Sequence, residues 1–222
     1  MFWLGRVSFG LVLLSLVGAG PPVRDERAPP PAPVGLEALM EQLASTSGMK
    51  VPFRESRRLA ILSEPIESEG VFFFAPPGDL ARTTLRPGRS RVVVRGDRVV
   101  FEDATGRQTF DISTDKLAQG LVGNFGVLLR GDLAELRRRY VLDFRVTQGA
   151  WMIEMRPRAR EMRMLVERIE VVGEGAHLSR MTTFESNGDR TDLFFGKAIP
   201  LSEIDPAERR EIFSVDSPGF LP

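Results

Sequence analysis

The sequence predicts an α+β fold with one large antiparallel sheet of roughly ten strands, an N-terminal helix and a helical insertion midway through the sheet. Three observations favour this class. From Val51 onward, apolar residues recur with a period of two and turn signals separate the runs. A helical pattern interrupts these runs near 113–140. No long helix separates consecutive strands, which argues against a doubly wound α/β fold.

The chain begins with a targeting pattern. Arg6 precedes an apolar run over 7–17, and small residues follow it up to Ala19. The run covers only about half of the hydrocarbon thickness of a bilayer, for which roughly 20 residues are needed. We therefore expect a signal peptide over 1–19, cleaved near Ala19, instead of an uncleaved anchor, and a protein located in the periplasm.

Prolines crowd the next segment, which reads PPVRDERAPPPAPV from Pro21 to Val34. This composition predicts a disordered linker over 20–34, because prolines favour an extended, solvated chain. A single domain is then expected over 35–222. It contains no cysteine, so its stability has to come from the packing of its core.

The first element of the domain is an amphipathic helix over 36–47, closed by Gly48. Leu36, Leu39, Met40 and Leu43 fall at i, i+3, i+4 and i+7, so they share one face. The first group of strands is predicted near 53–62, 68–75, 80–86, 90–95, 98–103 and 107–112. Gly96-Asp97 is a two-residue hairpin loop between β-branched runs.

The insertion predicts two helices. Ser113 or Thr114 caps the first, near 114–129, and Asp132 caps the second. The remaining strands are predicted near 140–147, 151–157, 163–172, 176–185 and 190–195. A sheet of this size usually curls, and the inserted helix is in a position to cover the open side of the curl.

The stretch GVFFFAPP, from Gly70 to Pro77, is apolar on both faces of its strand. Side chains alternate along a strand, so Phe72 and Phe74 face one way while Val71 and Phe73 face the other. Phe72 and Phe74 either line a cavity or pack as ordinary core under the helices, and their burial propensity alone does not separate the two.

Composition excludes several classes of function. The 222 residues contain no cysteine and one histidine, His177, which leaves no thiolate chemistry, zinc cluster or imidazole triad. Lys plus Arg and Asp plus Glu number 30 each and are interspersed, so no basic stripe is available for a phosphate backbone. We expect no metal, no cofactor and no nucleic-acid partner.

The remaining charged candidates are weak. Glu64, Glu67 and Glu69, or Glu154 and Glu161, lie among arginines and are better explained as a solvated face than as an acid–base pair. The segment RPRAREMR, over 156–163, is basic enough to touch lipid headgroups, although an exposed loop explains it equally well.

Several segments together resemble a known family. They are FRESR at 53–57, LRPGR at 85–89, Gly96-Asp97, LLRGDLAELRRRY at 128–140 and NGDRT at 187–191. Their order behind a signal peptide resembles the periplasmic outer-membrane lipoprotein carrier (LolA-like) family, in a divergent branch often associated with lipid exporters, over about 35–195. The resemblance implies an unclosed β-barrel whose helical lid covers an apolar cavity.

The chain departs from this family after its second strand. The family has an Arg-Pro pair, whose Arg holds the lid shut, followed by a Phe-x-Trp pair facing the cavity. This chain has Pro76-Pro77 and Leu80-Ala81-Arg82 at those places, which leaves Arg82 as the candidate latch. The cavity residues that the resemblance implies are Phe72, Phe74, Leu80, Arg82, Val92, Val94, Phe101, Leu121, Phe125 and Leu128.

The resemblance implies a non-enzymatic, monomeric carrier or chaperone that binds acyl chains of lipoproteins or other lipids and moves them toward the outer membrane. An inner-membrane exporter is the implied donor and an outer-membrane protein the acceptor. A lipid or stress sensor on the same fold, which predicts a second domain, and a lipid- or glycan-modifying enzyme, which predicts converging carboxylates, remain as alternatives.

Overall fold

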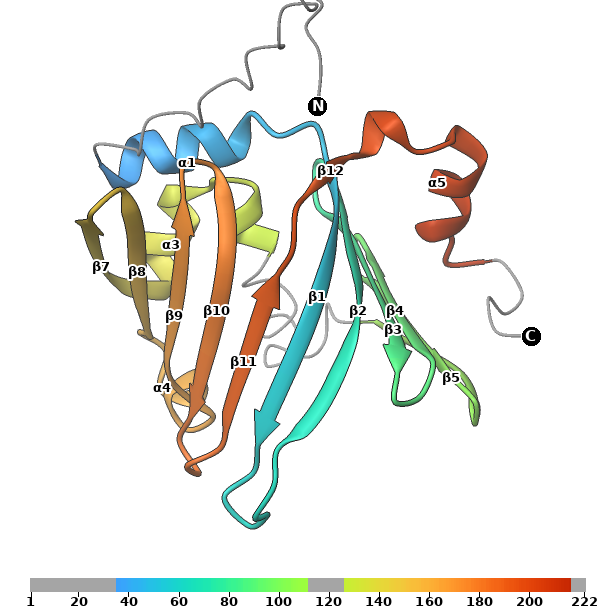
Figure 1. The fold of residues 1–222 in the computed structure, drawn as a ribbon, viewed down its shortest axis with the longest axis horizontal. Coiled ribbons are helices and arrows are strands. Elements are labelled where there is room, and N and C mark those ends of the chain that lie inside the picture. The colour runs from blue at the N-terminus through green and yellow to red at the C-terminus, as the bar shows by residue number, and fades with distance from the viewer. Residues whose placement is uncertain (1–34, 112–125, 217–222) are drawn as a thin grey trace, which may run out of the picture.

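In the computed structural model, which describes residues 35–111 and 126–216, one antiparallel sheet runs through the whole domain (Figure 1). Its strands follow the order β6-β5-β4-β3-β2-β1-β11-β10-β9-β8-β7, and β12 pairs with β1 beside this path. The sheet is strongly bent and does not close, because β6 and β7 stand at its two ends. The α+β class and the unclosed antiparallel sheet are confirmed.

The elements of the first half include one helix and six strands. They are α1 (Leu36–Ala44), β1 (Met49–Arg58), β2 (Ile66–Ala75), β3 (Asp79–Arg86), β4 (Ser90–Arg95), β5 (Arg98–Asp103) and β6 (Gly106–Asp111). The expected turn at Gly96-Asp97 joins β4 to β5, and Gly96 has a positive φ of 56°.

The second half completes the sheet. Its elements are α3 (Leu133–Arg139), β7 (Tyr140–Thr147), β8 (Ala150–Pro157), α4 (Arg160–Arg163), β9 (Val166–Glu174), β10 (His177–Glu185), β11 (Arg190–Phe195), β12 (Ile199–Pro200), the 3₁₀ turn η2 (Leu201–Glu203) and α5 (Pro206–Ile212). Asp132 caps α3 as expected, since its side chain accepts a hydrogen bond from the Glu135 amide.

β1 holds the two halves together. It pairs with β2 on one side and with β11 on the other, so that Phe53 lies opposite Gly70 and Phe195. A proline is tolerated within this central strand because it falls where β11 has ended and β12 has not begun. At this break the Pro52 carbonyl accepts a hydrogen bond from the Gly196 amide, 2.8 Å away.

Three predicted elements had wrong bounds. The strand predicted near 163–172 runs from Val166 to Glu174, because α4 occupies the residues before it. The helix predicted over 36–47 ends at Ala44, and the strand predicted over 53–62 runs from Met49 to Arg58. Pro52 lies inside β1, where the interruption on its β11 side accommodates it. The apolar residues Ile61 and Leu62 therefore lie outside the sheet, in an exposed connection.

Four elements were not predicted: α4, β12, η2 and α5. Within the predicted helix over 114–129, residues 126–129 are helical. The rest of that helix, together with the predicted segments 1–19 and 20–34, lies outside the described residues. Within the described ranges, no helix is both long and apolar enough to cross a membrane.

The two faces of the sheet carry separate cores. The inner face, which bears Phe53 and Ile153, packs against α1 and α3. The outer face, which bears Phe73 and Val93, packs against the C-terminal segment that contains Ile212. Figure 1 shows α1 and α3 beside the β7–β10 part of the sheet and α5 beside the β2–β5 part. The apolar residues on both faces of β2 therefore have different partners.

Candidate functional site

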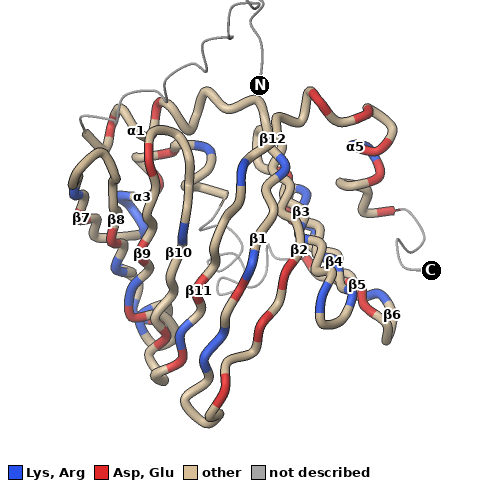
Figure 2. The backbone as a smooth tube through the Cα atoms, in the orientation of Figure 1, with Lys and Arg blue, Asp and Glu red and all other residues tan. Residues whose placement is uncertain are grey.

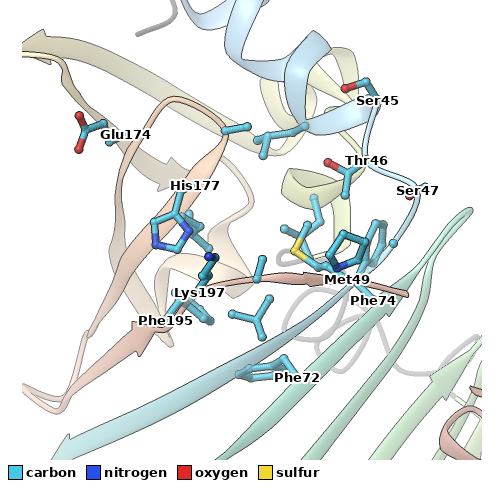
Figure 3. A pocket seen from close by; sticks show the side chains of 18 residues that line it. Ser45, Thr46, Ser47, Met49, Phe72, Phe74, Glu174, His177, Phe195 and Lys197 are labelled. Atoms are coloured by element: carbon cyan, nitrogen blue, oxygen red, sulfur yellow. The ribbon is translucent and has the colours of Figure 1, made fainter. Parts of the chain in front are cut away.

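The inner face holds a pocket of about 570 Å³ next to the end of α1 (Figure 3). We call it the inner pocket. Its apolar lining comes from α1, β1, β2, the helical residues 126–129, the β9–β10 turn, β10, β11 and the β12 region. The lining side chains are Leu43, Met49, Val51, Phe72, Phe74, Leu129, Ala176, Leu178, Phe195, Ala198 and Pro200. Pockets that bind small ligands usually enclose roughly 300–1,000 Å³ and are mostly apolar.

An aromatic group forms one side of the inner pocket. Phe72 on β2 and Phe195 on β11 have ring centroids 6.0 Å apart, and Phe53 on β1 lies 4.7 Å from Phe72. β2 and β11 lie on either side of β1, which pairs with both of them. The strand pairing therefore assembles the aromatic surface from the two halves of the chain.

Close packing fixes the loop between α1 and β1. Gly48 has a φ of 103°, and a Cβ at this position would lie 2.8 Å from the Phe74 carbonyl oxygen and 2.8 Å from the Leu201 side chain. A larger residue would be strained here both by its backbone conformation and by its neighbours. The loop consequently borders the pocket in one fixed position.

The β9–β10 turn is fixed in a similar way. A Cβ at Gly173 would lie 2.3 Å from the ring of Trp151. The indole of this buried Trp151 donates a hydrogen bond to the Gly175 carbonyl, 2.8 Å away. Trp151 thus positions the turn that carries the pocket residues Ala176, His177 and Leu178.

Polar groups border the inner pocket in two places. Ser45, Thr46 and Ser47 follow α1, and Figure 3 shows His177 and Lys197 next to each other with Glu174 further away. Neither His177 nor Lys197 makes an ion pair with any residue that the structure describes. The arrangement offers an apolar interior with two basic side chains at its border.

The candidate latch, Arg82, is engaged within the sheet. Its guanidinium donates to both carboxylate oxygens of Glu55, at 3.0 and 3.1 Å, and to the Ser68 hydroxyl at 3.4 Å. It also stacks over Phe53 at 4.5 Å and over Phe72 at 5.5 Å. Since the proposed partner helix falls largely in 112–125, outside the described residues, a latch role stays a prediction.

The structure separates the predicted cavity residues into groups. Phe72 and Phe74 line the inner pocket. Leu80 and Val94 are buried with Phe74 and Leu129, Val92 packs against this group, and Leu128 belongs to the main inner core. Phe101 is half-buried opposite Val92. Leu121 and Phe125 lie outside the described residues. The ligand role of this whole set stays a prediction.

Sequence reasoning missed most of the inner pocket. Its residues at 43–49, 176–178 and 195–200 come from three distant parts of the chain. The only usable local signal was Leu43, which the helix periodicity placed on the apolar face. The others meet because β11 pairs with both β1 and β10 while β12 pairs with β1, and a local sequence pattern does not reveal these pairings.

The structure offers little support for chemistry at the weaker candidates. The Glu67 carboxylate accepts a hydrogen bond from Ser56, and Glu69 and Glu154 pair with Arg86 and Arg156. Within the described residues, no group of three or more His, Cys, Asp or Glu is placed to hold a metal ion.

Comparison with known proteins gives one family match. The family described as "Outer membrane lipoprotein carrier protein LolA-like" matches residues 28–213, which is more than half of the chain. Among the curated proteins, none matches the sequence.

Solved structures show similar folds at low identity. A DUF1329 family protein from Desulfovibrio piger has a TM-score of 0.48 and 11% identity, with 81% of this chain and 95% of that chain covered. A putative outer membrane lipoprotein-sorting protein domain from Vibrio parahaemolyticus has a TM-score of 0.46 and 11% identity, with 80% and 96% covered. A LolA superfamily protein from Nitrosomonas europaea has a TM-score of 0.41 and 7% identity, with 79% and 99% covered.

Proposed function

Because the chain belongs to the outer membrane lipoprotein carrier protein LolA-like family, we propose that it is a periplasmic carrier that binds acyl chains in the inner pocket. The cargo is a lipoprotein or another lipid, which the protein moves toward the outer membrane without changing it chemically. An inner-membrane exporter is the proposed donor and an outer-membrane protein the proposed acceptor, and the carrier acts as a monomer.

The observation that carries this proposal is the apolar character of the inner pocket, with Phe72 and Phe195 on the two strands that flank β1. Each methylene group that leaves water contributes about 0.8 kcal/mol, so a hydrocarbon tail gains affinity in proportion to the length it buries. This interaction has no directional requirement. It therefore suits a carrier that has to accept different tails and release them again.

The border of the inner pocket is consistent with a ligand that has a polar end. Lys197 and His177 lie where a chain inserted into the pocket would place its headgroup, and the serines and threonine after α1 add hydrogen-bonding groups. A hydrocarbon tail alone needs none of these groups. The arrangement supports a ligand that is apolar inside and polar or anionic at the opening.

The proposal is tested by titrating the delipidated protein with a fluorescent fatty-acyl probe. Ala198 and Ala176 both line the pocket, and Ala176 is exposed on the β9–β10 turn, where a larger side chain leaves the core untouched. We expect Ala198→Trp and Ala176→Trp to reduce probe affinity by at least about tenfold, since each occupies space that the tail requires.

The matched control is Ala104→Trp, at an exposed turn position remote from the inner pocket. This variant is expected to bind the probe as the parent protein does. A parent protein without affinity for acyl probes, or equal affinity in all three variants, would contradict the proposal.

A further inference from the structure

Three connections meet at the end of the sheet opposite α1 (Figure 1). They are residues 59–65 between β1 and β2, residues 158–165 around α4, and residues 186–189 between β10 and β11, and we call them the distal rim. The Ala60 amide donates to the Asp189 carboxylate at 2.7 Å. The Ser186 amide donates to the Leu165 carbonyl at 3.0 Å. These hydrogen bonds make the three connections one continuous surface.

The distal rim and its border expose large apolar side chains. Ile61 is 89% exposed and Met164 is 71% exposed. Leu62, Leu165 and Ile66, the first residue of β2, are also exposed. Five of the eleven exposed large apolar residues in the described part of the chain therefore lie at this one end. Single exposed apolar residues are ordinary, but a group of them marks an interaction surface.

Arginines accompany these apolar residues. Arg58, Arg160 and Arg163 are exposed at this end, and Arg58 and Arg160 make no ion pair with the described residues. Figure 2 shows basic positions on the lower part of β1, with acidic positions nearby on the connection to β2. Glu64, Glu161 and Asp189 are the acidic members of this surface, and with Arg158 the arginines number four against these three. The guanidinium group is suited to phosphate because it can donate two parallel hydrogen bonds.

We propose that the distal rim docks on an anionic lipid bilayer. Ile61, Leu62 and Met164 enter the interfacial region, and the arginines contact the headgroup phosphates. The apolar side chains project from separate connections, which suits a deformable lipid surface better than one bound peptide. Other proteins that bind at the bilayer interface combine the same two contributions. Their apolar side chains enter the bilayer to a depth of about 5–10 Å, and their basic side chains are attracted to anionic lipids.

This surface is separate from the inner pocket. β9 begins at Val166, next to the distal rim, and ends at Glu174, at the border of the pocket. Nine residues of strand span roughly 30 Å. Bilayer docking and acyl binding are therefore independent properties, and the failure of one leaves the other intact.

The test is co-sedimentation of the full chain with vesicles of phosphatidylglycerol and phosphatidylcholine in equal parts, compared with vesicles of phosphatidylcholine alone. The N-terminal apolar run over 7–17 is identical in all variants, so only differences between variants are interpreted. We expect the double variant Ile61→Ser, Leu62→Ser to need at least about tenfold more lipid for half-binding. Arg58→Gln with Arg160→Gln should remove most of the preference for the anionic vesicles.

The matched control is Phe110→Ser on the edge strand β6, because Phe110 and Leu62 are equally exposed, at 48% each. This variant should sediment as the parent does, and all variants should keep the melting temperature and acyl-probe affinity of the parent. Unchanged sedimentation of the Ile61, Leu62 variant would overturn the proposal. The proposal would also be overturned if the parent chain bound neither kind of vesicle and instead crosslinked through position 61 to an envelope protein.

Discussion

Phe72 and Phe73 are neighbours in the sequence but belong to different cores on opposite faces of the sheet. Phe72 lines the inner pocket, whereas Phe73 is 7% exposed and packs with Val93 and Phe213 under the C-terminal segment. The sheet thus needs apolar residues on both faces of β2, one face for the inner pocket and the other for α5.

This relationship predicts opposite effects of two alanine substitutions. Phe73→Ala should lower the free energy of unfolding by about 3–5 kcal/mol, the usual cost of removing a buried ring, and leave acyl-probe affinity unchanged. Phe72→Ala should cost less stability, because Phe72 is only half-buried, and should weaken probe binding. Chemical denaturation and probe titration measure the two effects, and equal probe affinities in both variants would argue against the assignment of faces.

Lys197 predicts a preference for anionic ligands. Lys197→Gln should weaken binding of a fatty acid by about two- to fivefold, which corresponds to the loss of an exposed ion pair. Binding of the methyl ester of the same acid should not change, because the ester carries no charge. Lys50→Gln is the control, since Lys50 lies over the Phe73 ring on the outer face, 5.7 Å from its centroid. If the Lys197 variant bound both the fatty acid and the methyl ester more weakly, the side chain would shape the pocket and would not recognise charge.

The hydrogen bonds of Arg91 predict that this side chain holds the C-terminal segment against the sheet. Its guanidinium donates to the carbonyls of Glu211, Ile212 and Ser214, at 2.7, 2.8 and 3.2 Å. Arg91→Leu leaves these groups without that donor and should cost at least about 2 kcal/mol of stability. Amide exchange should accelerate first in α5.

The exposed Arg89→Leu is the control for this variant and should leave both measurements unchanged. If amide exchange in α5 were equally slow in the Arg91 variant, the apolar contacts of Ile212 and Phe213 alone would be sufficient to hold the helix.

The ion pairs of Glu135 predict a contribution to the stability of the fold that depends on pH. Hydrogen bonds from Arg138 and Arg139, at 2.6 and 2.5 Å, lower the pKa of Glu135 to about 2. A lowered carboxyl pKa stabilises the fold above the ordinary value near 4.5, and this stabilisation disappears as the pH falls toward 2. Glu135→Gln should therefore be less stable than the parent at pH 7, by less than about 1 kcal/mol because the two arginines are partly exposed, and the difference should disappear as the pH falls below 2.

The local pattern was sufficient for much of the sheet. β4, β5 and β11 have the predicted bounds, because alternating β-branched and aromatic residues end at clear turn signals such as Gly96-Asp97. α5 had an equally local signal that was overlooked. Asp205 accepts hydrogen bonds from the Ala207 and Glu208 amides, and Pro206 occupies the first helical turn, a typical helix start.

The inner pocket could not be derived from such patterns. Phe195 meets Phe72 through β1, and Pro200 meets Met49 through the short β12, so both contacts depend on pairing between distant segments. The expected strand over 53–62 also hid Ile61 and Leu62 within the sheet, whereas the early end of β1 at Arg58 exposes them.

The most direct test of acyl binding in the inner pocket is native mass spectrometry of the protein purified from its own envelope. We expect the parent protein to carry additional mass that organic solvent releases as acyl-bearing molecules, and Ala198→Trp to lack it while Ala104→Trp retains it. Parent protein that is recovered without bound lipid, and that takes up no acyl probe afterwards, would contradict the account.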